Sequence, residues 1–384
     1  MDQIYLDNAA TTCVRQQVTK KMASVLGSFY GNPSSTHSFG RSSKSIIEQC
    51  RKNIASYFNV KPSEIIFTSG GTEADNLVLR SAVIDLGVKH IITSKIEHHA
   101  VGHTIEYLKE NFDIEISYVK ILKDGTIDYK HLKQILSNNS QFTLVSLMHI
   151  NNEIGTILDI DCVSNLCKEY NALFHSDTVQ SIGHYPLDLS KIKIDFIAAS
   201  AHKFHGPKGI GFAFIRSGLG IKSIITGGSQ ERGYRSGTES LHDIVGLNES
   251  LKISYDKMNE EKAYIGGIKS YFIEKLKDTI PDIKFNGCSD HPASSTYKLV
   301  NVCFPVNAEK SPLFLFQLDL KGIACSKGSA CQSGSDSGSH VLKEILSEDD
   351  LNKPSIRFSF SSFNTNDEID FVVNTLKDLV FESD

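Results

Sequence analysis

The sequence of 384 residues contains no apolar run near the ~20 residues that a membrane-spanning helix needs. It contains no basic run either, and a formal net charge of −5 gives no indication of a nucleic-acid partner. The N-terminal residues Met1 to Tyr5 lead directly into a strand-like pattern that lacks the features of a signal peptide. We therefore expect a cytoplasmic protein that contacts neither membranes nor nucleic acid directly.

Paired cysteine motifs are also missing. None of the eight cysteines forms a Cys-x-x-Cys pair, and none has the Cys/His spacing of a zinc site. We expect no metal ion, and we expect most of these cysteines to be reduced and packed as small hydrophobic residues. Internal repeats are absent as well.

What the sequence does contain is an alternation of strand and helix patterns from about residue 64 to residue 215. This alternation predicts an α/β fold with a parallel or mostly parallel sheet between helices. From about residue 250 a long charged helical pattern, Ile253 to Leu276, leads into a separate α+β unit. The chain is long enough for two hydrophobic cores. We predict a large domain over residues 15–255 and a small α+β domain formed by residues 1–14 and 256–384.

Lys203 follows an apolar run, Ile192 to Ala199, that predicts a buried strand. The lysine lies beside two histidines and a Gly-Pro turn. A lysine amine can form a Schiff base with an aldehyde cofactor, of which pyridoxal 5′-phosphate is the commonest. The alternative is a loop lysine whose aliphatic stem covers apolar surface. Lys203 alone does not decide between them.

Asp177 ends the preceding apolar segment, about one βα unit before Lys203. A carboxylate in this place can pair with a pyridinium nitrogen and keep it protonated, which makes the ring an electron sink. An acidic residue at a strand end is more commonly a turn former or a helix cap. An acid and a lysine at the ends of neighbouring strands together favour a cofactor site, because open α/β sheets bind ligands at this edge.

At this point the sequence resembles a known family. The pattern Asp177-x-x-Gln180 followed by Ser200-x-His202-Lys203 resembles the fold-type I pyridoxal-phosphate enzymes, and the nearest branch is the cysteine desulfurases of the NifS/IscS type. The resemblance covers nearly the whole chain and keeps the order of the motifs. It implies a seven-stranded, mostly parallel sheet between helices in the large domain, with a smaller α+β C-terminal domain.

The segment Ile65 to Ala74 contains a strand, a Gly70-Gly71 turn and the start of a helix. Free backbone N–H groups at a helix N-terminus suit a phosphate, and Thr72 adds a hydroxyl donor. No Gly-Lys-Ser/Thr follows, so this is not the P-loop of nucleotide-binding proteins.

The resemblance assigns a role to each residue around the cofactor. It places the phosphate on Gly71, Thr72, Ser200 and His202, and on Thr238 from the other subunit of a homodimer. It makes His98 the residue that stacks on the cofactor ring and acts as acid or base, and Asn152 the donor to the ring hydroxyl. Asp177 and Gln180 complete the contacts to the ring, and Lys203 holds the cofactor covalently.

Two residues are expected to contact the substrate. Arg357 lies in Ile356-Arg357-Phe358-Ser359, and its planar fork suits the α-carboxylate of an amino acid. Without the resemblance, an arginine in an apolar strand is more commonly an edge residue or part of an ion pair. Asn8, in a turn near the N-terminus, is expected to contribute a polar group to the substrate pocket.

The segment of about residues 325–340 is rich in Ser and Gly and contains Cys331. Such a composition predicts a mobile loop, in which an accessible thiol can act as a nucleophile once it is ionised. Gly328-Ser329-Ala330-Cys331 resembles the desulfurases that have a long catalytic loop. We therefore expect Cys331 to be the catalytic cysteine, and we expect Cys325 to be packed.

The resemblance implies a cysteine desulfurase. Such an enzyme takes L-cysteine, leaves L-alanine and a persulfide on Cys331, and passes the sulfur to an iron–sulfur scaffold or a tRNA-thiolation enzyme. Another pyridoxal-phosphate reaction, such as that of an aminotransferase or a selenocysteine lyase, is the alternative among enzymes. A non-catalytic sulfur carrier or scaffold partner that merely retains the fold is the alternative outside them.

Overall fold

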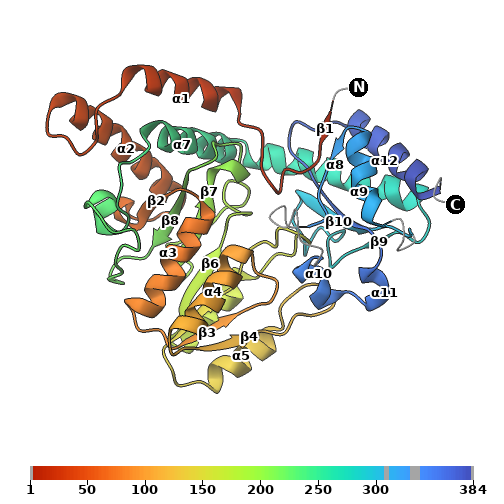
Figure 1. Cartoon of the computed structure of the whole chain (residues 1–384), viewed down its shortest axis with the longest axis horizontal. Coiled ribbons are helices and arrows are strands. Elements are labelled where there is room, and N and C mark those ends of the chain that lie inside the picture. The colour runs from red at the N-terminus through yellow and green to blue at the C-terminus, as the bar shows by residue number, and fades with distance from the viewer. Residues whose placement is uncertain (1–2, 307–310, 329–337, 382–384) are drawn as a thin grey trace.

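The computed structural model describes residues 3–306, 311–328 and 338–381. Cys331 therefore lies outside the described residues. Figure 1 shows the main sheet and its helices on the left and a second group of strands and helices, with both chain ends, on the right. Within the described residues, no helix has the length and apolar character needed to cross a membrane.

The main sheet has seven strands in the order β2-β8-β7-β6-β5-β3-β4. Only β8 runs antiparallel to its neighbours in this sheet, which confirms the predicted mostly parallel α/β fold. The strands are β2 (Ile65–Thr68), β3 (His90–Thr93), β4 (Glu115–Tyr118), β5 (Thr143–Ser146), β6 (Leu173–Asp177), β7 (Phe196–Ser200) and β8 (Gly211–Ile215).

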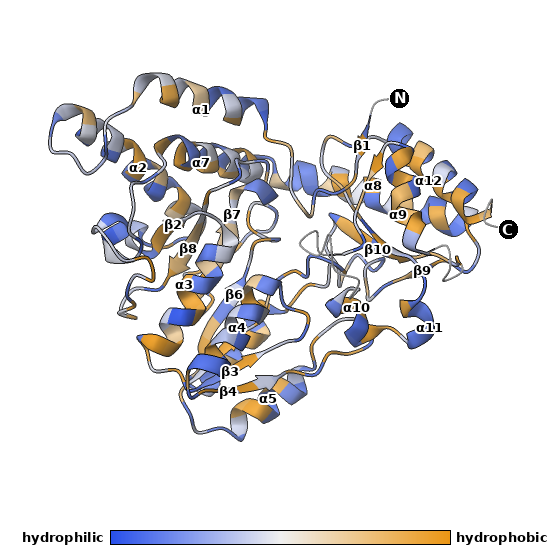
Figure 2. Cartoon of the chain, viewed as in Figure 1, coloured by the Kyte–Doolittle hydropathy of each residue, from blue (hydrophilic) through white to orange (hydrophobic). Residues whose placement is uncertain are grey.

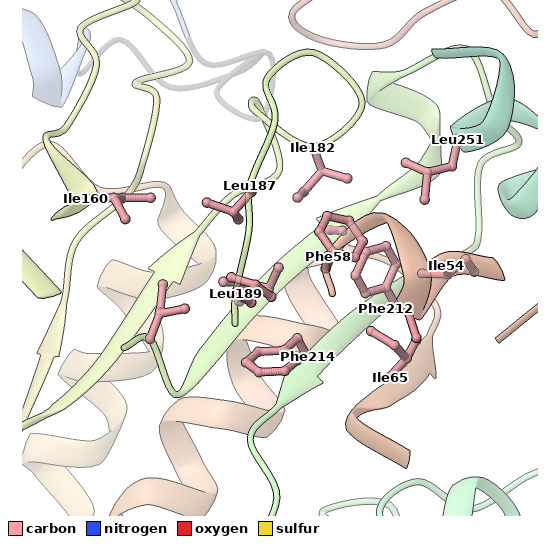
Figure 3. Packing of buried hydrophobic residues seen from close by; sticks show 14 of the residues in the cluster. Ile54, Phe58, Ile65, Ile160, Ile182, Leu187, Leu189, Phe212, Phe214 and Leu251 are labelled. Carbon is pink, nitrogen blue, oxygen red and sulfur yellow. The ribbon is translucent and has the colours of Figure 1, made fainter. Parts of the chain in front are cut away.

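Helices cover both faces of this sheet, because alternate strand residues point to opposite sides. On one face Phe174 and Phe212 belong to the core shared with α2, α5, α6 and α7. Figure 3 shows part of this core, where Phe58 lies against Phe212. On the other face Ile66 and Ala198 pack with α3 and α4. The covering helices are α2 (Ser38–Tyr57), α3 (Gly71–Ile84), α4 (His99–Asn111), α5 (Tyr129–Ser137), α6 (Ile160–Glu169) and α7 (Leu241–Asp256), and α1 (Gln16–Ser28) packs on α7.

The second group of elements has its own hydrophobic core, to which Ile4 and Leu6 contribute from the N-terminal segment. Its antiparallel sheet has the order β12-β10-β9, and β1 pairs in parallel with β11. In Figure 2 the helices of this group carry both apolar (orange) and polar (blue) residues. The elements are β1 (Ile4–Tyr5), α8 (Met258–Thr279), β9 (Lys284–Phe285), β10 (Leu299–Cys303), α9 (Ser311–Leu320), β11 (Ile323–Ala324), α10 (His340–Ile345), α11 (Glu348–Leu351), β12 (Ser355–Ser359) and α12 (Asn366–Phe381).

Two sequence predictions about local structure are wrong. The strand expected from Ile192 begins only at Phe196, because the backbone N–H of Ile192 donates to Asp188 in a turn and Ile194 is buried before the strand starts. The helix expected over Ile253 to Leu276 is two helices, α7 and α8, that meet at Lys257.

A buried ion pair fixes the loop that follows β8. Arg51 of α2 donates from Nη1 and Nη2 to the two carboxylate oxygens of Glu231, each over 2.7 Å. Glu231 also accepts from the backbone N–H of Phe67 over 2.8 Å. Glu231 and Arg232 have left-handed φ values of 45° and 58° in the short helix η3 (Gln230–Gly233), so the ion pair holds an otherwise unfavourable turn.

The substitution Glu231→Ala leaves the buried Arg51 guanidinium without its buried carboxylate partner, and we expect the free energy of unfolding to fall by about 3–5 kcal/mol. Glu48→Ala removes a half-exposed partner of the same arginine and serves as the matched control, with an expected loss below ~1 kcal/mol. Urea denaturation followed by circular dichroism measures both. Equal losses in the two variants would contradict the importance of the buried pair.

Candidate active site

The parallel pairing of β6 with β7 brings two of the predicted site residues to the same edge of the sheet. Asp177, the last residue of β6, lies opposite Ala198 of β7. β7 ends two residues later, at Ser200, and the short helix η2 (Ala201–Lys203) follows directly. Because both strands end at this edge, the Asp177 carboxylate and the Lys203 side chain face the same space.

The Lys203 amine lies where the main sheet meets the N-terminal segment of the second group of elements. Its Nζ donates to the carbonyl oxygens of Ala9 and Ala10 over 2.7 and 2.8 Å. These two residues follow the N-terminal segment that packs into the second core. These two backbone carbonyls help to hold the lysine side chain at the cavity, which it lines.

Asp177 is 5% exposed. Its Oδ1 accepts from the backbone N–H of Val179 over 2.9 Å. Burial raises the pKa of Asp177 to about 6, and the hydrogen bond from Val179 and the positive charge of Lys203 oppose this rise. The carboxylate is thus poised to pair with a cationic group.

A cavity of about 200 Å³ lies at this edge. Ten of the predicted site residues line it. They are Gly71, Thr72, His98, Asn152, Asp177, Gln180, Ser200, His202, Lys203 and Arg357. The cavity is also lined by Ala9, Ala10, Asp75, Met148 and Val179.

The N-terminus of α3 forms one wall of the cavity. Gly71 is the first helical residue, and a Cβ atom at this position would lie 2.5 Å from the Val179 side chain. Glycine thus allows the strand end to approach the helix end closely. The first N–H groups of a helix have no partner within the helix and attract an anion. Glu73 in this first turn is paired with Arg235 over 2.8 Å.

Two side chains in the cavity have properties that suit a flat, polar ring. His98 accepts at Nδ1 from the backbone N–H of Ala100 over 3.1 Å. Burial, and then the charge of Lys203, lowers the pKa of His98 to about 4, so the imidazole is neutral at pH 7. Gln180 donates from Nε2 to the Ala9 carbonyl over 2.9 Å, while its Oε1 is buried and has no hydrogen-bond partner among the described residues.

Arg357 lies on β12 of the three-stranded sheet, and its side chain lines the cavity. It is 1% exposed, and its Nη2 donates to Asp7 Oδ1 over 2.7 Å. Its Nη1 donates to the Asn152 carbonyl over 2.8 Å, and its Nε lacks a hydrogen-bond partner within the described ranges. The guanidinium is therefore oriented by two acceptors and still lines the cavity.

Among the described residues, two that were predicted for the site, Asn8 and Thr238, are not in the cavity lining. The Asn8 amide is buried and donates to the Ser359 carbonyl over 2.9 Å, which fixes the N-terminal turn, so the predicted substrate contact has no support from its position. Thr238 is exposed on the loop after η3. Cys331 lies outside the described residues.

The sequence analysis missed Asp75, which lines the cavity and is 1% exposed. Its Oδ1 lies 3.3 Å from His175 Nε2. Burial and the nearby charges of Asp177 and Glu97 raise the pKa of Asp75 well above its usual range. The signal was available, because Asp75 lies three residues after Thr72 and so shares its face of α3.

This donor set fits pyridoxal 5′-phosphate. The helix N-terminus and the hydroxyl of Thr72 suit the phosphate, and the carboxylate of Asp177 suits the pyridine nitrogen. Lys203 supplies the amine, and the buried Gln180 Oε1 is an acceptor without a partner among the described residues. The fold and the cavity therefore define a pyridoxal-phosphate enzyme of fold type I.

Comparisons with known proteins identify the family. The model of the family "Aminotransferase class-V" matches residues 4–372. The chain is 39% identical over 380 residues to the "Cysteine desulfurase IscS" of Dictyoglomus turgidum, covering 98% of this chain and 94% of that protein. The solved structure of a "NifS-like protein" has a TM-score of 0.89 at 31% identity, with 99% of this chain and 100% of that chain covered. The structure of "SspA in complex with cysteine" has a TM-score of 0.81 at 28% identity, with 94% and 100% covered.

The chain belongs to the class-V aminotransferase family. The cysteine desulfurase among its relatives agrees with the resemblance found in the sequence. Enzymes of this family depend on pyridoxal 5′-phosphate, in agreement with the donor set of the cavity.

Buried histidines predict a loss of stability in mild acid. Burial lowers the pKa of His149 to about 4, whereas an unfolded histidine titrates near 6.5. Between these pH values the unfolded chain binds a proton that the folded chain does not. The contribution of buried, neutral His149 to the free energy of unfolding is therefore fully present above pH 6.5. It decreases toward pH 4, by about 3 kcal/mol for one such histidine.

We expect His149→Gln to flatten the dependence of the unfolding free energy on pH between 6.5 and 4, measured by urea denaturation at several pH values. His291→Asn, at an exposed position, is the matched control and should keep the profile of the unchanged protein. An identical profile in all three proteins would show that His149 does not contribute.

Proposed function

We propose that this enzyme is a cysteine desulfurase. It converts L-cysteine to L-alanine and leaves the sulfur as a persulfide on Cys331. The observation that carries the proposal is a single cavity in which the Lys203 amine, the Asp177 carboxylate and the Arg357 guanidinium lie together. The desulfurase named above, similar over nearly its full length, and the relative solved with cysteine support the choice of reaction and substrate.

In this proposal each side chain has a defined task. Pyridoxal 5′-phosphate, when bound, supplies an electron sink that stabilises negative charge at the substrate α-carbon. Lys203 would hold the cofactor through its amine and would move the α-proton of the substrate. Asp177 would keep the pyridine nitrogen protonated, and neutral His98 would stack on the ring. Gln180 and Asn152 would orient the ring by hydrogen bonds.

The remaining residues bind the anionic groups and receive the sulfur. Gly71, Thr72, Ser200 and His202, which line the cavity, would hold the phosphate. Arg357 binds the substrate carboxylate with the donor capacity that Asp7 and the Asn152 carbonyl leave available. The Cys331 thiolate attacks the substrate sulfur, so that the carbon–sulfur bond breaks and a sulfur–sulfur bond forms.

The proposal extends to domains, partners and location. The two hydrophobic cores support a large domain over residues 15–255 and a small domain of residues 1–14 and 256–384. The persulfide sulfur passes to a protein acceptor such as an iron–sulfur scaffold or a tRNA-thiolation enzyme. The enzyme acts in the cytoplasm.

An anaerobic assay with L-cysteine and a reductant tests the reaction. We expect the unchanged enzyme to release alanine and sulfide in equal amounts. Cys331→Ser should keep the yellow colour of the bound cofactor and lose at least ~100-fold in rate, because it lacks the nucleophile. Cys325→Ser is the matched control, since burial raises the pKa of the Cys325 thiol and keeps it from reacting.

The control should retain nearly the full rate of alanine formation. If Cys331→Ser released sulfide as fast as the unchanged enzyme, Cys331 would have no part in the reaction, and another lyase activity on the same cofactor would be indicated.

The active enzyme is a homodimer in this proposal. Apolar side chains are exposed around the connection between α1 and α2, namely Leu26, Phe29, Tyr30 and Phe39. Exposed apolar groups gathered in one place are typical of an interface. The loop that carries Thr238 is tied to the α3 N-terminus through Arg235 and Glu73, and its exposed threonine is free to reach the phosphate site of a second subunit.

Sedimentation equilibrium should give the mass of two chains. Thr238→Ala should keep this mass but weaken cofactor retention in equilibrium dialysis by about 10- to 150-fold, the loss expected for one hydrogen bond to a charged group. A monomer that binds the cofactor fully, or a Thr238→Ala dimer with unchanged retention, would contradict the shared site.

A further inference from the structure

One buried carboxylate touches both ends of the segment that carries Cys331. Glu153 is fully buried and follows Asn152, which lines the cavity. Its Oε2 accepts a short hydrogen bond from the Ser339 hydroxyl. A Cβ atom at Gly328 would lie 2.6 Å from the same oxygen. Residues 328 and 339 are eleven positions apart in the sequence and meet at this single side chain.

The backbone of Glu153 is itself rigidly held. Its N–H donates to Asn151 Oδ1 over 2.9 Å, and its carbonyl accepts from Asn301 Nδ2 of β10 over 3.0 Å. Its second carboxylate oxygen, Oε1, is buried and has no hydrogen-bond partner among the described residues. Burying a carboxylate destabilises the folded state unless its hydrogen bonds are made, so the buried position of Glu153 lowers the free energy of unfolding.

The two stems of the Cys331 segment, residues 325–328 and 338–340, are otherwise attached near the same cavity. In the first stem, Ser326 exchanges backbone hydrogen bonds with Arg357, over 2.7 and 3.3 Å. In the second stem, His340 lies 2.9 Å through Nε2 from the Glu97 carbonyl and 4.6 Å, between ring centroids, from His99. Arg357 and Glu97 each contact one stem, whereas Glu153 contacts both.

We propose that Glu153 is a positioning residue that holds both stems of the Cys331 segment at the rim of the cofactor cavity. The inference rests on the proposed desulfurase function, since the stems matter for the reaction only if Cys331 receives the sulfur. Glu153 does not touch the cavity and takes no part in the bond changes. It fixes where the two described stems of the segment begin and end.

Two substitutions test this contact from opposite sides. Glu153→Ala removes the carboxylate, and we expect kcat for alanine formation to fall about 10-fold with little change in KM, because small misplacements of a reacting group cost up to ~100-fold. Glu153→Gln keeps the shape and an acceptor for Ser339, and should restore most of the rate. Gly328→Ala should also lower kcat, since its Cβ atom meets Oε2.

The double variant decides whether the effects share one cause. In Glu153→Ala the oxygen that collides with Cβ is gone, so adding Gly328→Ala should cost little more, and the two effects are not additive. Gly267→Ala, in an open position of α8, is the matched control and should leave kcat unchanged.

A second readout needs neither substrate nor activity. Lys327 is exposed in the first stem, so trypsin cleavage after it reports local opening of that stem. We expect cleavage to be about 10-fold faster in Glu153→Ala than in the unchanged protein, with Glu153→Gln close to normal. The absorbance of the bound cofactor should be the same in all variants.

The outcomes are distinct. Unchanged cleavage and kcat in Glu153→Ala would overturn the proposal, and so would a lower melting temperature without faster cleavage after Lys327. If the unchanged protein formed no alanine from L-cysteine, the proposed function would fail, while the cleavage rates would still test whether Glu153 holds the stems.

Discussion

The site depends on the parallel alignment of β6 and β7. Because Asp177 pairs in register with Ala198, the chain leaves the sheet two residues later at the same edge and places Lys203 beside the carboxylate. A buried acid and a partly buried amine stabilise each other's charged forms only at short range, and the sheet fixes that range. The positive charge of Lys203 accordingly opposes the rise in the pKa of Asp177 that burial causes.

The second constraint is that residues from both parts of the chain, the main sheet with its helices and the second group of elements, line the cavity. The carbonyls of Ala9 and Ala10 receive the Lys203 amine, and Arg357 of β12 donates to the Asn152 carbonyl after β5. Each contact joins an element of the main sheet to an element packed in the other core. The site is therefore complete only when the two parts of the chain are docked together, which ties its geometry to the folding of the whole chain.

Much of this arrangement could be predicted from the sequence, because strand ends and helix starts carry local patterns. Lys203, Asp177 and Gly71 were found in this way. The apparent strand from Ile192 was misleading, since apolar residues buried in a turn look like strand residues. The role of Asn8 stays a prediction, because a motif gives the order of residues but not the direction of a side chain, and the Asn8 amide donates to the Ser359 carbonyl.

Other features have no local signal. Glu153 lies in a turn between two elements, and its meeting with Gly328 and Ser339 depends on packing between distant parts of the chain. The same holds for the buried pair of Arg51 and Glu231, which are 180 residues apart. Such contacts follow from the tertiary fold and could not be read from periodicity or turn chemistry.

The most direct test of the account identifies the lysine that holds the cofactor. Borohydride reduction of the cofactor-loaded enzyme fixes the cofactor to its amine, and mass spectrometry of the peptides locates it. The chain offers an internal comparison in Lys298, a second lysine buried near the site, whose pKa burial and the charge of Lys203 lower to about 7. The account predicts a phosphopyridoxyl group on Lys203 alone, and a group on Lys298 or on neither lysine would contradict it.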